Sequence, residues 1–194
     1  MSYDLENVKL KWEKYQSLCA KLKDENIDIF LEFMGERIIM CPSSLRESEH
    51  NCGPGGLVQH ALDVALAMKS INTALKLEVP TSSILKVALF HEIGKIGDEE
   101  NPWVVEQDSE WHREKLGQNY KYSESTQKMS ISHRTLFLLQ RFNIKLTQEE
   151  WIAIQISPGS HYEENRFYAG NETALGILLQ KAKAFAIHQS TAKV

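Results

Sequence analysis

The segment 87–95 places three ionisable side chains inside a strongly apolar stretch of the chain. Its sequence, VALFHEIGK, has apolar residues on nearly every side of a helix drawn through it, so we expect a buried helix here. Burying unpaired charged groups costs several kcal/mol or more, so His91, Glu92 and Lys95 all need strong partners. Any fold of this chain must therefore match these three side chains with an ion or with opposite charges.

Two kinds of partner would satisfy these buried groups. Neutral imidazole and carboxylate groups both bind divalent metal ions, so His91 and Glu92 are candidate metal ligands. Lys95 lies one helical turn away, where its ammonium group would meet a phosphate bound at the metal. The alternative is a structural ion pair of Glu92 with Lys95 or Arg134, beside a core histidine that has no ligand role.

Helical periodicity dominates the rest of the chain. Apolar residues recur at steps of three and four residues, the spacing of one helix face, over about 4–25, 57–68, 130–139 and 173–188. Ser82 or Ser83 is the expected N-cap of the buried helix. The sequence TQEE at 147–150 is a capping box, which predicts another helix start at Thr147.

Three segments depart from this helical pattern. We expect the short apolar segment 27–33 to end at a break near Gly35, with an extended piece over 37–42. The loop 43–56 is rich in Ser, Gly and Pro, and loops of this length inside a compact domain are often functional. The polar and aromatic excursion 97–123 is expected to leave the helical core and to contain a small hairpin.

These patterns predict an all-α fold and a single domain over residues 1–194, with the N-terminal helix at about 4–25 packed on the core. A chain of 194 residues is long enough to bury one sizeable core. The sequence contains no internal repeat, low-complexity run or linker that would divide it.

Composition narrows the classes of partner. The net charge is −4 and no block of Lys and Arg is present, so we expect no binding of duplex nucleic acid, whereas small anions need only local positive charge. Three cysteines without a CxxC pair indicate reduced thiols. Without a signal peptide or a membrane-spanning apolar run, we expect a cytoplasmic protein that does not enter the membrane. A homo-oligomer is left open.

Histidines near the starts of separate helices extend the candidate metal site. His60 follows the glycines of the loop 43–56, and His133 lies in the first turn of the helix predicted at 130–139. Together with His91 and Glu92 they have the composition of a metal shell, provided that their helices converge on one centre.

The motifs around these residues resemble the HD superfamily of metal-dependent phosphohydrolases. The resemblance rests on GGLVQH at 55–60 and LFHEIGK at 89–95, with further similarity between about 40 and 186 to a small subset found in bacteria and phages. It implies an HD-type helical domain that binds a divalent metal ion (Mn, Mg, Fe, Ni or Zn). It also implies hydrolysis of a nucleotide or another small phosphoester.

The resemblance further implies roles for individual residues. His60, His91 and Glu92 would bind the metal, and His133 would hold a second metal ion or contact phosphate. Glu92 and Lys95 are the expected catalytic residues, with Lys95 stabilising charge that develops on the reacting phosphate.

The polar and aromatic side chains of the excursion 97–123 are further candidates for contact with a substrate. The aromatic side chains of this segment, together with His112, Arg113 and Lys121, are expected to close over a bound ligand. The alternative is that this segment is a variable surface loop without a binding role.

Three positions depart from the HD pattern. Glu92 replaces an Asp, Ser157 lies where many relatives have a ligand His, and Lys183 replaces the closing Asp ligand. A protonated lysine cannot bind a metal ion, so Lys183 would either stand in the metal's place or pair with Glu92. These departures support a second hypothesis, in which the chain is a degenerate HD-fold protein without metal that serves as a nucleotide-binding or protein-interaction module.

Overall fold

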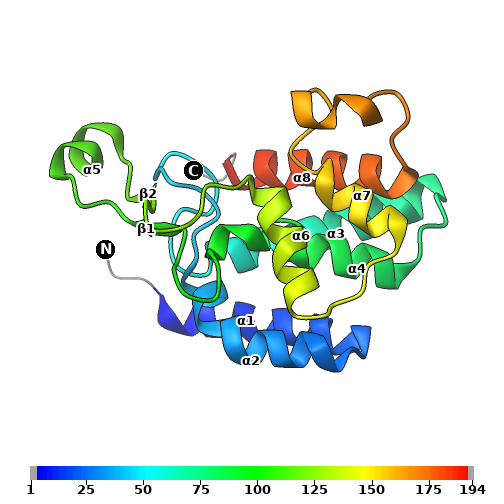
Figure 1. Cartoon of the computed structure of the whole chain (residues 1–194), viewed down its shortest axis with the longest axis horizontal. Coiled ribbons are helices and arrows are strands. Elements are labelled where there is room, and N and C mark those ends of the chain that lie inside the picture. Colours follow the sequence, from blue (N-terminus) through cyan, green and yellow to red (C-terminus); the bar gives the residue numbers. More distant parts are fainter. Residues whose placement is uncertain (1–3, 192–194) are drawn as a thin grey trace.

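The computed structural model describes residues 4–191, and these are mainly helical (Figure 1). The α-helices are α1 (Leu5–Cys19), α2 (Glu25–Met40), α3 (Gly56–Leu75), α4 (Thr81–Phe90), α5 (Glu110–Leu116), α6 (Ile131–Arg141), α7 (Gln148–Gln155) and α8 (Ala174–Thr191). The smaller elements are the 3-10 helices η1 (Ala20–Leu22), η2 (Ile93–Ile96) and η3 (Glu163–Tyr168) and the strands β1 (Val104–Glu106) and β2 (Tyr120–Tyr122). The predicted all-α fold class is confirmed.

Helices α3 and α4 form the middle layer of the molecule. In Figure 1 the pair α1 and α2 lies below them, and α7 and α8 lie above. Helix α6 stands upright across the middle of this view and contacts η2 and α7. The core between these layers is made of fully buried side chains such as Phe30, Val64, Phe90 and Leu179. Burial of each such side chain stabilises the fold by about 1.5–3 kcal/mol.

Helix α2 continues through the position where the sequence predicted a break. The break near Gly35 and the extended piece over 37–42 are both wrong, because α2 runs on to Met40. A Cβ atom at residue 35 would lie 3.2 Å from the ring of Trp12. Glycine at this position therefore lets α1 approach α2 closely, and it marks a contact between two helices instead of a helix end.

The buried helix that leads to the His91–Glu92 pair ends earlier at its C-terminus than predicted. Helix α4 starts at Thr81 with Pro80 as N-cap, so the predicted serine N-caps are wrong. The helix ends at Phe90, and Glu92 has left helical geometry, with φ −115° and ψ 13°. Only the short helix η2 follows it, so the segment 87–95 is not one continuous helix.

Side chains from other helices stabilise this early end of α4. The Tyr15 hydroxyl donates to the Leu89 carbonyl at 2.9 Å, and the Thr135 hydroxyl donates to the His91 carbonyl at 3.3 Å. The Gly94 amide in turn donates to Thr135 Oγ1 at 2.9 Å. These bonds satisfy backbone groups that a helix end otherwise leaves without partners.

The excursion 97–123 contains the expected hairpin. Strands β1 and β2 pair antiparallel, with Val104 opposite Tyr122. Between the two strands lies the short helix α5, which Gly117 caps at φ 58°. Within residues 4–191, no helix combines the length and apolar character needed to cross a membrane.

Candidate metal centre

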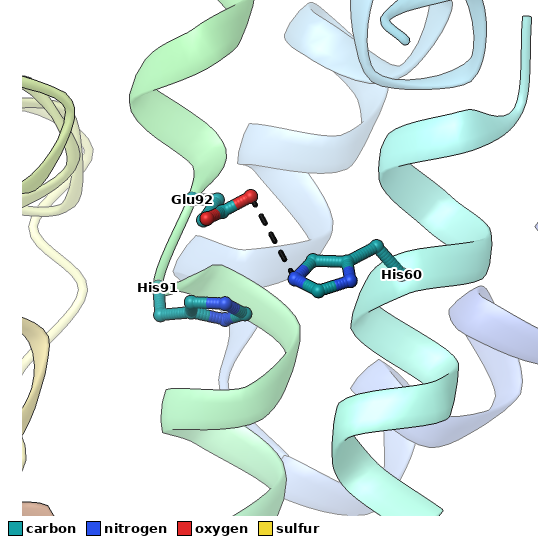
Figure 2. A group of neighbouring side chains, drawn as sticks. All are labelled: His60, His91 and Glu92. Atoms are coloured by element: carbon teal, nitrogen blue, oxygen red, sulfur yellow. Dashed lines mark ion pairs between the residues drawn. The ribbon is translucent and has the colours of Figure 1, made fainter. Parts of the chain in front are cut away.

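Three buried side chains converge between α3 and the end of α4. His60 comes from the second turn of α3, and His91 and Glu92 come from the junction between α4 and η2. Each offers one ligand atom, and these atoms all lie within 4.8 Å of one another. Figure 2 shows the three side chains pointing toward one another across the space between the two helices. Glu92 Oε2 lies 3.8 Å from His60 Nε2.

The loop 43–56 fixes where α3 begins and so where His60 lies. Gly55 adopts φ 75°, a left-handed conformation that favours glycine. At Gly56 a Cβ atom would lie 2.0 Å from the Asn51 carbonyl oxygen, so no other residue fits there without moving the loop. The glycines seen in the sequence thus place His60 one turn into the helix and fully buried.

The two imidazoles carry nitrogen atoms without hydrogen-bond partners. His91 Nδ1 donates to the Ala88 carbonyl at 3.0 Å, which leaves the lone pair on Nε2. His91 Nε2 and both ring nitrogens of His60 are buried and have no partner among the described residues. Burial lowers the pKa of His91 to about 4 and the pKa of His60 well below its usual value, although Glu92 opposes both shifts. Both rings are therefore neutral at pH 7, which is the form that binds metal ions.

Glu92 is paired with two lysines. Its Oε1 lies 2.6 Å from Lys183 Nζ, and its Oε2 accepts from Lys95, which also donates to the Ser43 carbonyl. Burial raises the pKa of Glu92, but the ammonium groups of Lys183 and Lys95 outweigh it and hold this pKa well below its usual value. Both pairs were alternatives raised from the sequence, and both are present. Two ammonium groups and two neutral imidazoles thus surround one carboxylate, so positive charge is in excess.

A cavity of about 620 Å³ opens beside Glu92 and Lys95. Its walls come from the loop 43–56 with Pro42, from the hairpin and from α6, and are lined by Pro42, Ser43, Ser44, Leu45, Arg46, Glu49, His50, Val104, Gln118, Tyr122 and Ile131. Backbone hydrogen bonds join the loop 43–56 to the segment just before β2. Glu47 N donates to Gly117 O at 2.8 Å, and Asn119 N donates to Leu45 O at 3.0 Å.

His50 is a cavity residue that sequence reasoning missed. Its ring centroid lies 5.0 Å from that of His60, and its Nε2 lies 3.0 Å from Ser43 Oγ. Burial lowers the pKa of His50 below its usual value. Its place in the loop just before the glycines, on the path to His60, was the signal in the sequence that could have identified it.

Four predicted ligands lie outside this group. His133 is exposed on α6 and faces a separate cavity with Phe137 and Trp151. The other three contact their own segment: Arg113 donates to Gln107 O at 2.8 Å, Lys121 pairs with Asp108 at 2.7 Å, and His112 Nδ1 lies 2.7 Å from Ser109 Oγ.

The excursion contributes Val104, Gln118 and Tyr122 to the cavity, so one of the aromatic side chains expected to face a ligand does lie there. Successive side chains of a strand point to opposite faces. Tyr122 lines the cavity, so its neighbour Lys121 points elsewhere. Ser157, at one of the positions that departs from the HD pattern, is buried just after the end of α7.

Comparisons with family models, with curated proteins and with solved structures give no match for this chain.

Proposed function

We propose that His60, His91 and Glu92 bind one divalent metal ion and that the site hydrolyses a small phosphoester, as the resemblance to HD phosphohydrolases implies. The observation that carries this proposal is the set of buried, unpartnered imidazole nitrogens that face a carboxylate. Leaving a buried polar atom unsatisfied costs about 1–3 kcal/mol, and bonds to a metal ion would recover this free energy.

The donor set fits a transition metal ion. Two imidazoles and one carboxylate suit Mn, Fe, Ni or Zn, whereas Mg prefers a shell made of oxygen atoms. The hydrogen bond from His91 Nδ1 to Ala88 O orients this ring toward the group, as expected of a metal-binding histidine. A divalent ion bound there would lower the pKa of its water and neutralise charge on a phosphate.

The remaining residues supply the phosphate site. Lys95 lies on the cavity wall and is held by Ser43 and Glu92, so its ammonium group is positioned before a ligand enters. The excess positive charge around Glu92 attracts a phosphate dianion. The same charge repels a metal cation, so we expect the metal ion and phosphate to strengthen each other's binding.

The test loads the purified protein separately with Mn, Fe(II), Ni, Zn or Mg and measures bound metal and phosphate release from adenosine 5′-monophosphate. We expect about one ion per chain, and turnover that a chelator abolishes. His91→Ala should lose both properties, while His133→Ala, which changes an exposed histidine outside the group, should keep both. Bound metal below about a tenth of an ion per chain, with no turnover, would contradict the proposal.

One observation favours a second candidate function, a metal-free nucleotide-binding module. Lys183 Nζ lies 2.6 Å from Glu92 Oε1, and a protonated lysine cannot serve as a ligand. In such a protein the two lysines would hold the phosphate and no hydrolysis would follow. Calorimetry in the presence of a chelator separates the two functions. Nucleotide binding that His91→Ala leaves unchanged and Lys183→Met weakens would favour the module.

A further inference from the structure

The cavity beside Glu92 is larger than a phosphate group requires. Its volume of about 620 Å³ falls in the range of about 300–1,000 Å³ that is usual for drug-sized ligands. Its charged lining side chains are those of Arg46, Glu49, Glu92 and Lys95. Leu45, Val104 and Ile131 give other parts of its wall an apolar character. A ligand that fills it therefore carries a substantial apolar part besides any phosphate.

Tyr122 offers a rigid aromatic surface on this wall. The strand register places it opposite Val104, so both side chains point to the same face of the hairpin, and both line the cavity. Its ring stacks on Trp103, with the ring centroids 4.2 Å apart and the ring planes 14° from parallel. Arg134 in turn lies over the Trp103 ring, with its Cζ 4.2 Å from the ring centroid.

The stack on Trp103 holds the Tyr122 ring in place before a ligand binds. The residue is still 46% exposed, although Trp103 packs against its ring. A ring that is already immobilised loses little conformational freedom when a second planar group stacks on it. A tyrosine phenol with its usual pKa is uncharged at pH 7 and does not repel an anionic ligand. Burial raises the pKa of Tyr122, and the carboxylates of Glu92 and Glu49 raise it further, so it stays uncharged here.

Polar groups beside Tyr122 could contact the edge of such a ligand. Gln118 and Arg46 pair through a backbone bridge between the hairpin segment and the loop 43–56, and both line the cavity. An amide and a guanidinium group provide the hydrogen bonds that planar heteroaromatic rings accept and donate.

We propose that the cavity binds a nucleoside phosphate, with its base stacked on Tyr122 and its phosphate at Lys95. The inference rests on the phosphate chemistry proposed above for the same site. Its new element is Tyr122 as the residue that selects ligands with an aromatic base over phosphoesters without one. A sugar phosphate without a base makes only the phosphate contacts. We expect it to bind at least about tenfold more weakly than the nucleotide, as the loss of one stacked base predicts.

The test measures binding of adenosine 5′-monophosphate and ribose 5-phosphate to the whole chain by calorimetry, with and without metal. The native protein should prefer the nucleotide by about tenfold or more. Tyr122→Leu should abolish this preference and leave ribose 5-phosphate affinity within about twofold, while Tyr122→Phe should keep it. Tyr162→Leu is the matched control, because Tyr162 is 47% exposed and does not line the cavity.

A measurement on the native protein alone covers the case in which Tyr122→Leu does not fold. Free adenosine should compete with adenosine 5′-monophosphate, because it retains the stacked base. Equal affinities for the two phosphates, a preference that survives in Tyr122→Leu, or no competition by adenosine would overturn the inference.

The binding measurements also separate this inference from the proposed hydrolysis. A preference for the nucleotide that depends on Tyr122, in a protein without metal or turnover, would uphold the base site and reject the hydrolase. Turnover that depends on the metal, with equal affinities for both phosphates, would uphold the hydrolase and reject the base site.

Discussion

At the scale of single residues, Lys183 separates the two candidate functions. Lys183 lies on α8, the last helix of the core, and its ammonium group pairs with Glu92. Lys183→Asp removes a positive charge beside the candidate ligands and supplies a carboxylate, which is a metal ligand. We predict that it raises the affinity for Mn or Zn by about tenfold or more, measured by equilibrium dialysis.

The matched variant Lys183→Met removes the charge without adding a ligand, so its gain in metal affinity should be smaller. A metal affinity that is the same in the native protein and in Lys183→Asp would mean that residue 183 does not contact the metal site.

Glu92 pairs with a buried ammonium group on Lys95 and a partly exposed one on Lys183, so its neutralisation should destabilise the fold. Glu92→Gln keeps the shape of the side chain but leaves Lys95 and Lys183 without a counter-charge. Removing one partner of a buried ion pair typically costs about 3–5 kcal/mol, and we predict a loss of about 3 kcal/mol in the free energy of unfolding because Lys183 is partly exposed.

Urea unfolding with a chelator present measures this loss. Glu164→Gln is the control, because Glu164 is exposed and should change stability by less than about 0.5 kcal/mol. A similarly small change in Glu92→Gln would show that the two lysines do not depend on this carboxylate.

The sequence was informative about buried charged residues and less so about exposed ones. The apolar surroundings of His91 and Glu92 required a strong partner, and the possible Glu92–Lys183 pair followed from the HD resemblance. His133 is exposed, while its neighbours Ser132 and Arg134 are buried. One position along a helix turns a side chain by about 100°, and one position along a strand reverses it, and the sequence did not fix that register.

At the scale of elements, the contact between η2 and α6 depends on Gly94. A Cβ atom there would lie 2.3 Å from Ile131 O and 2.8 Å from Thr135 N, and both of these are backbone atoms that cannot rotate away. Gly94→Ala must therefore push α6 away from the segment that carries Glu92 and Lys95. We predict a loss of about 2–3 kcal/mol in the free energy of unfolding, together with weaker metal binding.

Gly35→Ala is the matched comparison, because it also adds a methyl group where two elements meet. Its new Cβ meets a side chain, the Trp12 ring, at 3.2 Å, and alanine favours the helix by up to about 1 kcal/mol. It should therefore change stability much less than Gly94→Ala, as urea unfolding of the two variants would measure. Equal losses would contradict this account of the two glycines.

These two glycines also show where prediction of elements from sequence fails. The Thr147–Glu150 capping box is local chemistry, and the structure confirms it. The end of α4 depends on Tyr15 and Thr135, which approach from other helices, and the continuation of α2 through Gly35 depends on the Trp12 ring. Tertiary contacts of this kind decide element boundaries and leave no local pattern in the sequence.

At the scale of the whole molecule, the candidate site is a product of core packing. His60 lies on α3, Glu92 follows α4 and Lys183 lies on α8, and α3 packs against both other helices. The site therefore forms only when three separate parts of the chain are assembled. The sequence could name these residues, but their distances depend on how the helices pack.

The same packing buries ionisable groups that should weaken the fold in alkali. Burial, with a smaller effect of the Asp28 carboxylate, raises the pKa of Cys19 from 9.0 to about 12, and burial also raises that of Cys41 to about 12. In the unfolded chain both thiols ionise near pH 9, whereas in the folded protein they stay protonated. The stability is therefore fully present below pH 9 and is lost as the pH rises toward 12, because the unfolded chain releases its protons first.

We predict that the free energy of unfolding falls by about 1 kcal/mol for each buried thiol between pH 8 and pH 10, measured by urea unfolding at both values. Cys19→Ala removes one of these groups, so its stability should fall by about 1 kcal/mol less over the same interval, whatever its stability at pH 8. The comparison within each variant separates ionisation from the cavity that the substitution leaves. If native protein and Cys19→Ala lose the same amount between the two pH values, ionisation of this thiol does not contribute to alkaline unfolding.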